Sequence, residues 1–330
     1  MEFPRRAVNV ERALAAALLA AALGASWVQS RSVLAGRVRD GRPWLAWVEA
    51  RQAGGSLPPS FDLAVYDPAA RRLSVLHVPE DLKLDRRRTL ERAYADALKA
   101  SGAPDDAARA AEDLAEARLR ELSPEPIPEV SARLKVDVSP AAGGDEPSVA
   151  AALALKAQSR SPRACLALAR RAWRAARGGD RSAFDPLLFA LELRKIPLAA
   201  LQPARLPDEG QAPELLGRVL ATDAPPEDPH ETTVEVLNAS GVPGLATRAA
   251  KMLRLRAVDV LTTGTARPRA RTLVFDRVGD FRRAAKALDA LDCPTARALT
   301  RVDPSRVVDV TVEIGGDCAG QFGTGEGREP

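Results

Sequence analysis

The chain has 330 residues, of which 46% are hydrophobic, so it can form the cores of two globular domains. Its 48 basic and 44 acidic side chains leave a net charge of +4, which argues against nucleic acid as a partner. Its two histidines and three cysteines lie far apart in sequence, which excludes the common His/Cys metal clusters, and we expect no metal or other cofactor.

The N-terminal segment, residues 1–35, is typical of a membrane anchor or a signal sequence. Arg5, Arg6 and Arg12 precede an uncharged run from Ala13 to Ser30. Positive charges before such a run favour a cytoplasmic N terminus and export of the remainder, so we expect a single-pass protein of the cytoplasmic membrane with an extracytoplasmic (periplasmic) bulk. The run is short for a span, and a cleaved signal peptide is the alternative. Both interpretations export the chain.

Residues 36–205 alternate between strand and helix patterns, as expected of an α/β domain. The strand patterns cover residues 44–48, 61–66, 73–78 and 132–138. The second and third are joined by turn residues and predict a hairpin. Helical patterns cover residues 89–100, 105–122 and 185–200.

A further helix in this domain is predicted to carry a basic stripe. Four arginines recur at the spacing of one helical face: Arg163, Arg170, Arg174 and Arg177. An adjacent face is apolar and contains Leu166, Ala169 and Trp173. An anionic wall polymer or a lipid headgroup could bind there. The alternative is an ordinary solvated face, because amphipathic helices normally carry their charges outward.

Residues 206–231 are rich in proline and acidic residues, with a brief helical pattern near Leu215 to Leu220, and we interpret them as a linker. Residues 232–318 predict a small β-α-β-β-α-β domain. Its helices, near 245–253 and 281–291, each have one apolar stripe, so both should lie on one face of the sheet. The last strand is predicted at 307–314. Residues 319–330 are expected to form a disordered tail.

Two features of this C-terminal domain leave alternatives open. Gly241 and Gly244 precede its first helix, where backbone N–H groups could hold an anion, or the glycines could serve only the turn. Export places Cys293 and Cys318 in an oxidising compartment, where they could form a disulfide or remain two unrelated thiols. Cys165 is most simply a small core residue.

The C-terminal domain resembles that of the LytR-CpsA-Psr cell-envelope proteins. The matching segments are Val236 to Asn238, Gly241 to Ala246, Val274 to Arg277, and Asp309 to Asp317. They contain no nucleophile with an adjacent base and no paired carboxylates at a metal spacing, so binding is the expected role of this domain.

The first domain resembles, more faintly, the catalytic domain of the same family. Trp47 to Arg51 is similar to its opening strand, and Leu76 to Asp81 is similar to the segment that normally reads Ser-Ile-Pro-Arg-Asp. The resemblance implies transfer of a glycopolymer from a polyprenyl-pyrophosphate lipid to peptidoglycan. In such a reaction arginines bind the pyrophosphate and carboxylates hold Mg²⁺.

This sequence departs from the catalytic pattern at charged positions. Glu80 stands where the family has its phosphate-binding arginine, and Pro59 stands where it has a metal-binding aspartate. The residues that remain are Arg51, Asp81, Arg170 and Asp180. We therefore interpret the domain as a degenerate member of the family.

The expected protein is an exported, membrane-anchored, non-catalytic cell-envelope protein that binds peptidoglycan, an anionic wall polymer or an envelope protein. One alternative is an active glycopolymer transferase with Mg²⁺, which would lose several kcal/mol of transition-state stabilisation with each missing charge partner. A second alternative is a scaffold for an active homologue.

Overall fold

The computed structural model describes residues 32–52, 58–138, 146–177, 183–221 and 231–322, together with Gly24. Apart from Gly24, the uncharged run that predicts the membrane segment lies outside these ranges. Among the helices within them, none has both the length and the apolar character that crossing a bilayer requires.

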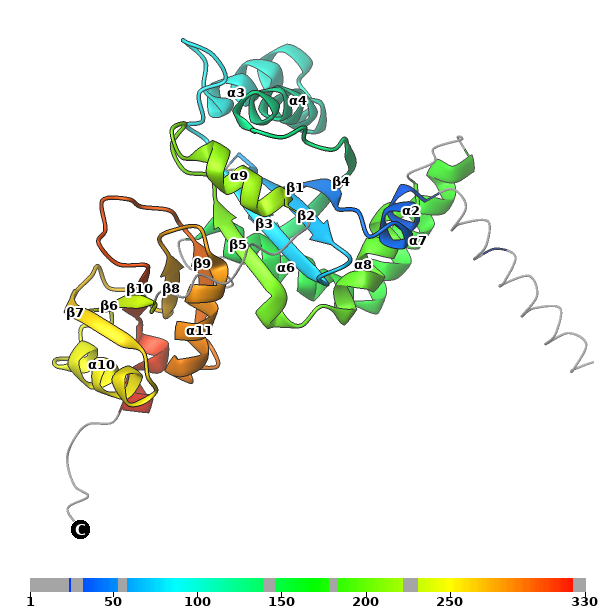
Figure 1. Cartoon of the computed structure of the whole chain (residues 1–330). Helices are drawn as coiled ribbons and strands as arrows, with labels where there is room; N and C mark the ends of the chain where they lie inside the picture. Colours follow the sequence, from blue (N-terminus) through cyan, green and yellow to red (C-terminus); the bar gives the residue numbers. More distant parts are fainter. Residues whose placement is uncertain are drawn as a thin grey trace, which may run out of the picture.

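The described strands form one mixed sheet, in the order β4-β1-β2-β3-β5-β9-β8-β10-β6-β7 (Figure 1). The first half of the chain contributes β1 (Trp44–Gln52), β2 (Ser60–Asp67), β3 (Arg72–Val78), β4 (Val130–Val138) and β5 (Leu201–Arg205). The second half contributes β6 (Thr233–Asn238), β7 (Asp259–Thr265), β8 (Leu273–Asp276), β9 (Arg297–Thr300) and β10 (Val310–Ile314). Only β2 against its two neighbours and β8 against β10 pair antiparallel among these strands.

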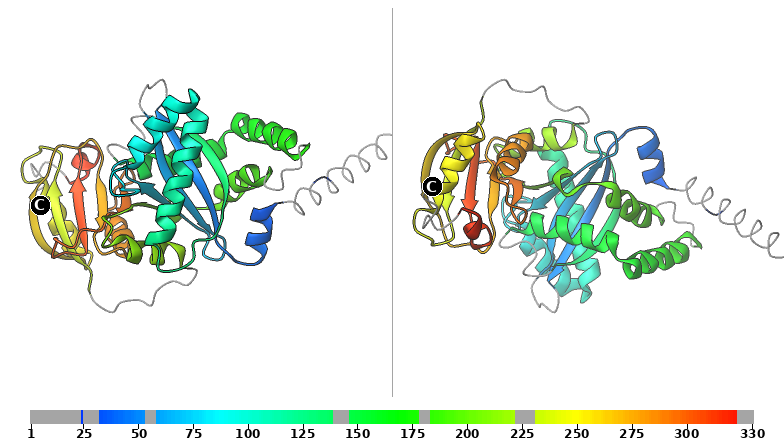
Figure 2. Two further views of the ribbon diagram at one scale, coloured as in Figure 1. Left: turned by 90° about the horizontal axis from the view of Figure 1, so that it is seen from above. Right: turned by 90° about the horizontal axis from the view of Figure 1, so that it is seen from below.

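In the first half, helices cover both faces of the sheet (Figure 2). One face carries α3 (Leu90–Ser101), α4 (Pro104–Leu122) and α9 (Ala212–Leu220). The opposite face carries α2 (Val33–Arg39), α6 (Pro147–Arg160) and α8 (Asp185–Lys195), with α7 (Pro162–Arg177) against α6 and α8. Strands covered on both faces are mostly buried and rich in apolar residues, as β1, β2 and β3 are. Their buried positions also include polar side chains, namely Glu49, Asp62, Asp67, Ser74 and His77.

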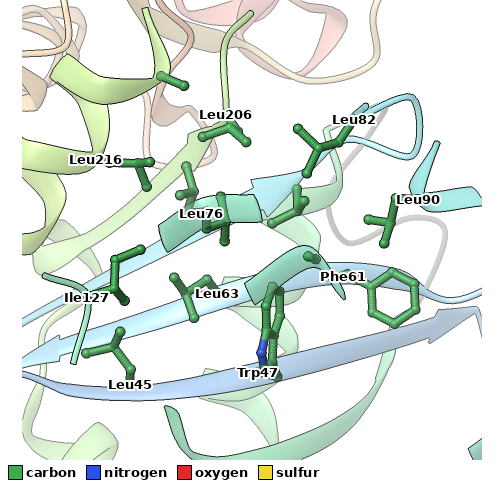
Figure 3. Close-up of a cluster of buried hydrophobic side chains, with 14 of the residues drawn as sticks. Leu45, Trp47, Phe61, Leu63, Leu76, Leu82, Leu90, Ile127, Leu206 and Leu216 are labelled. Carbon is green, nitrogen blue, oxygen red and sulfur yellow. The ribbon is translucent and has the colours of Figure 1, made fainter. Parts of the chain in front are cut away.

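The face under α3, α4 and α9 is filled by side chains. Figure 3 shows Leu45, Trp47, Leu63 and Leu76 rising from three adjacent strands to meet Leu216 and others of the same cluster. Trp47 and Leu76 are completely buried. Side chains packed in this way leave the described part of this face as core.

The second half pairs a sheet with two helices, α10 (Leu245–Leu255) and α11 (Phe281–Leu291). Both contribute to one hydrophobic cluster with β6, β8 and β10, so they lie on the same face, as predicted. The predicted β-α-β-β-α-β order omitted β9, which follows α11. The last strand begins at Val310 rather than at Val307, whose side chain is 94% exposed.

The opposite face of the second half is covered by a helix from the first half. Val149 and Leu153 of α6 pack against Leu273, Phe275 and Leu299. The two parts of the sheet also meet where Ala204 of β5 pairs with Thr300 of β9. The two halves of the chain therefore share one sheet and part of their core.

Three segments differ from the sequence-based assignment. Residues 206–221 were assigned to a linker, but Leu206 is buried and α9 packs into the core of the first half. The helix expected over 185–200 ends at Lys195 because a 3-10 turn and β5 follow. Residues 319–322, expected in the tail, belong to the 3-10 helix η2 (Gly316–Phe322), which buries Phe322.

Cys293 and Cys318 form a disulfide with their Cα atoms 6.1 Å apart. The bond joins the end of α11 to η2, where both residues are buried. It closes a loop that contains β9 and β10. The C-terminal end of the fold is therefore held covalently to its second helix.

Candidate functional site

Three neighbouring parallel strands, β3, β5 and β9, end at the same edge of the sheet. The loops that follow them, residues 79–83, 205–211 and 301–305, surround a cavity of about 970 Å³. In α/β proteins ligands bind outside the carboxyl ends of parallel strands, because the loops there converge on one crevice. We refer to this cavity as the strand-end cavity.

Charged side chains of both signs line the strand-end cavity. Among the described residues, four of them make no hydrogen bond or ion pair through their side chains: Asp81, Lys83, Arg205 and Asp208. Arg205 is partly buried, and the other three are exposed. Two cations and two carboxylates without protein partners remain available to a polar ligand.

Further charged groups of the cavity are held by the protein itself. Ser305 donates from Oγ to Asp303 Oδ1 over 2.5 Å, and this hydrogen bond holds the pKa of Asp303 below its usual value. Arg118 pairs with Glu209 at 3.0 Å, and Arg301 pairs with Glu146 at 3.4 Å. The Arg118–Glu209 pair holds the loop after β5 against α4 within the first half, and the Arg301–Glu146 pair joins the second half to the first.

Arg51 lies outside the strand-end cavity, at the end of β1. Its Nε donates to Glu49 Oε1 over 2.5 Å, and its Nη2 donates to Asp105 Oδ1 over 3.0 Å. Lys135 of β4 pairs with the same Asp105 at 2.5 Å and, with Arg51, holds the pKa of this carboxyl below its usual value. Two carboxylates therefore neutralise the guanidinium that the resemblance assigns to pyrophosphate.

Arg133 of β4 forms a second charged cluster near Arg51, in which it bridges β4 to α4. Its Nε donates to Glu112 Oε2 over 2.6 Å, and its Nη2 donates to Asp113 Oδ1 over 2.6 Å. Burial raises the pKa of Glu112 to about 7, although Arg133 acts in the opposite direction. Glu112 is therefore a buried acid that changes charge near neutral pH.

The predicted basic stripe lies on the other side of the sheet from Arg51. Arg163 and Arg170 are exposed on α7, which packs on α8 and α6. Arg51 contacts α4 on the opposite face. Arg174 and Arg177 are on α7 by position, and Asp180 lies outside the described residues. Arg51 and Arg170 are therefore not brought to one site with Asp81.

Gly241 and Gly244 both have positive φ angles, 77° and 72°, which favour glycine. The turn also binds its own polar groups: Ser240 Oγ accepts from the Val242 N–H over 3.0 Å, and Asn238 Oδ1 accepts from the Ser240 N–H over 3.0 Å. Two backbone donors of the turn are thus already occupied by its own side chains.

Of the residues that line the strand-end cavity, the sequence pattern predicts only Asp81 as a site residue. Arg205 is the last residue of β5, Arg301 follows β9 directly, and Lys83 lies in the loop after β3. A charge just beyond a buried strand is the signal that could have found them. The sequence pattern does not predict the strands β5 and β9 themselves.

Two clusters elsewhere offer little to a ligand. His77 Nδ1 lies 3.3 Å from Asp62 Oδ1, but these residues are only 5% and 0% exposed. Cys293, Asp317 and Cys318 lie within metal-binding distance of one another. Both sulfur atoms of that group belong to the disulfide, so they are not thiolate ligands.

One part of the chain is similar to a known family. Residues 231–317 match the family model LytR_C, described as LytR cell envelope-related transcriptional attenuator. The match covers β6 to β10, and the resemblance of the first half to the catalytic domain stays a prediction.

No curated protein matches the chain. Among solved structures, the Lin1025 protein from Listeria innocua aligns with 12% identity over 55% of this chain and 98% of its own. The TM-score of 0.26 is too low for this likeness to bear on the fold or the function.

Proposed function

We propose that this is an exported, membrane-anchored cell-envelope protein that binds a wall component without chemical conversion. Two observations support a role in the envelope. Residues 231–317 match a family described as cell envelope-related. The uncharged run after Arg12 has the pattern of an export segment.

The single observation that carries a binding role is the strand-end cavity, with its unpaired groups of both signs. A ligand that places one charge sign there would meet repulsion from Asp81 and Asp208 or from Lys83 and Arg205. Peptidoglycan combines sugar hydroxyls with short peptides that carry both amino and carboxylate groups. We therefore assign it as the ligand ahead of a purely anionic wall polymer.

The charges around Arg51 favour binding over glycopolymer transfer. A lipid pyrophosphate would have to displace Glu49 and Asp105 from the guanidinium. Glu80, where the family has an arginine, would add repulsion. Transfer from a polyprenyl-pyrophosphate lipid with Mg²⁺ stays the alternative.

The test is retention of the purified full-length protein on isolated peptidoglycan. The double substitution Lys83→Ala and Arg205→Ala should lower retention at least fivefold, because it removes both unpaired cations of the cavity. The matched control is Arg92→Ala with Lys99→Ala, two exposed cations on α3 outside the cavity, and its retention should equal that of the wild type.

Other outcomes would select the alternatives. If the cavity variant and the control variant are retained equally on peptidoglycan, the strand-end cavity is not the binding site. Magnesium-dependent binding of a polyprenyl-pyrophosphate lipid would favour the transferase. Binding of neither ligand would favour a protein partner, such as an active homologue held by a scaffold.

A further inference from the structure

Helix α7 exposes apolar side chains that the fold does not bury. Leu166 and Trp173 are 53% and 52% exposed, although most side chains of this size in the described core are almost fully buried. The inward side of α7, with Leu168 and Ala172, faces α8 and β4 across a cavity of about 310 Å³. Leu166 and Trp173 are seven residues apart and therefore lie on one outward side of the helix.

The same outward side is strongly basic. Helix α7 contains arginines at positions 163, 170, 171, 174 and 177 and no acidic residue. Arg163 and Arg170 are exposed on this side, whereas Arg171, although exposed, lines the inward cavity with Leu168 and Ala172. A helix with an arginine face beside exposed tryptophan and leucine has the composition of one that lies flat on an anionic bilayer.

The position of α7 in the fold agrees with contact between this helix and a bilayer, because α7 lies close to the end of the predicted membrane segment. Ser32, the first residue of the continuous described chain, donates from Oγ to Asp185 Oδ1 over 2.6 Å, and the Leu34 N–H donates to Asp185 Oδ2 over 3.2 Å. Asp185 begins α8, against which α7 packs. The uncharged run ends at Ser30, so Ser32 lies within about 7 Å of its end, at roughly 3.5 Å per residue.

Figures 1 and 2 show α2, α7 and α8 at one end of the molecule and β6, β7 and α10 at the other. A second copy of this chain is a poorer occupant, because two arginine faces would repel each other. A soluble wall polymer would match the charge but not Leu166 and Trp173.

We propose that the outward side of α7 binds the anionic lipid surface of the membrane that holds the chain, with Leu166 and Trp173 in the interface and the arginines on lipid phosphates. This proposal rests on the proposed export of the chain. It adds a second membrane contact, which fixes the orientation of the folded part and directs the strand-end cavity relative to the bilayer.

The test measures how fast a membrane-impermeant maleimide modifies full-length protein in vesicles. In a Cys165→Ala background, Leu166→Cys is the probe and Leu255→Cys is the matched control, since Leu255 is 80% exposed on α10 at the other end. The ratio of the two rates corrects for the fraction of protein that faces outward.

In phosphatidylcholine vesicles with phosphatidylglycerol, the ratio should fall at least fivefold relative to detergent. In phosphatidylcholine alone it should fall much less. Adding Arg163→Glu and Arg170→Glu should restore the ratio. An unchanged ratio with anionic vesicles would overturn the proposal. So would equal protection of Leu166→Cys by soluble polyphosphate, which would make a wall polymer the occupant.

A separate measurement tests the anchor. Flotation of the same full-length protein with uncharged phosphatidylcholine vesicles reports insertion of the N-terminal segment. If the protein fails to float with phosphatidylcholine vesicles but Leu166→Cys is still protected on anionic vesicles, the anchor would be overturned and the membrane contact of α7 supported. Flotation without protection of Leu166→Cys would support the anchor and overturn the proposed membrane contact of α7.

Discussion

Ala204 of β5 pairs with Thr300 of β9, and this step joins the strands of the two halves of the chain into one sheet. Thr300 Oγ1 also donates to the buried Asp276 Oδ2 over 2.8 Å, which ties β9 to β8. The strand-end cavity lies where these strands end, and loops from both halves line it. The shape of the strand-end cavity, and so the binding of any ligand in it, therefore depends on how the two halves are joined.

The packing of α6 between the halves can be tested with a buried charge. Val149→Glu would place a carboxylate against Leu273, Phe275 and Leu299, and we expect it to lower the free energy of unfolding by about 3 kcal/mol or more. The matched control is Val307→Glu at a position that is 94% exposed, with an expected change within about 0.5 kcal/mol. Urea denaturation measures both. Similar values for the two variants would show that α6 does not seal this junction.

The disulfide should stabilise the second half of the chain. Replacing Cys293 and Cys318 with alanine removes a link across 25 residues, and the expected loss is roughly 3 kcal/mol of unfolding free energy. Chemical denaturation without reductant measures this loss. Cys165→Ala is the control, because this cysteine is free and only partly buried. A double variant as stable as the control would contradict a structural role for the bond.

Glu112 predicts a pH dependence of stability. Burial raises its pKa to about 7 in the folded state, above the ordinary value of 4.5, so the folded protein binds the proton more tightly than the unfolded chain does. The resulting stability is present below pH 4.5 and is lost as the pH rises through 7. Between pH 5 and pH 8 the loss from this group is about 2 kcal/mol.

The variant Glu112→Gln lacks this titration and should gain stability relative to the wild type as the pH rises from 5 to 8. Glu91→Gln, the same change at an exposed position of α3, is the matched control for the removal of a carboxylate. Asp276, whose pKa burial raises to about 6, contributes to the wild-type slope in the same direction. A Glu112→Gln variant with the full wild-type slope would contradict the assignment to Glu112.

Substitution at Gly244 separates the two interpretations of its turn. The backbone at Gly244 is left-handed, which alanine adopts at a cost, and an added Cβ would lie 3.1 Å from Arg248 Nη1. We therefore expect Gly244→Ala to lower the free energy of unfolding by about 1 to 2 kcal/mol. If the glycine serves only the turn, inorganic phosphate will stabilise this variant and the wild type equally in thermal denaturation. Phosphate stabilisation of the wild type alone would support an anion site.

The sequence alone was enough to predict elements that have one dry face and one wet face. The apolar stripes of α10 and α11 predicted that both helices pack on one face of the sheet, and the alternation of residues predicted the strand β10. Both predictions were possible because periodicity reports a contrast between core and solvent. The resemblance over residues 231–317 agrees with the family match. Asp81 was the one predicted site residue that lines the strand-end cavity.

Only the tertiary structure revealed the elements without that contrast. Helix α6 was missed because it is apolar on several sides: Ala151 and Leu155 meet the first half of the sheet, while Val149 and Leu153 meet the second. The strands β5 and β9 are too short for a clear period, and Pro203 interrupts the first of them. Their pairing brings Arg205 and Arg301 to one cavity from positions far apart in the sequence. Local pattern cannot encode that juxtaposition, because it arises from packing between distant segments.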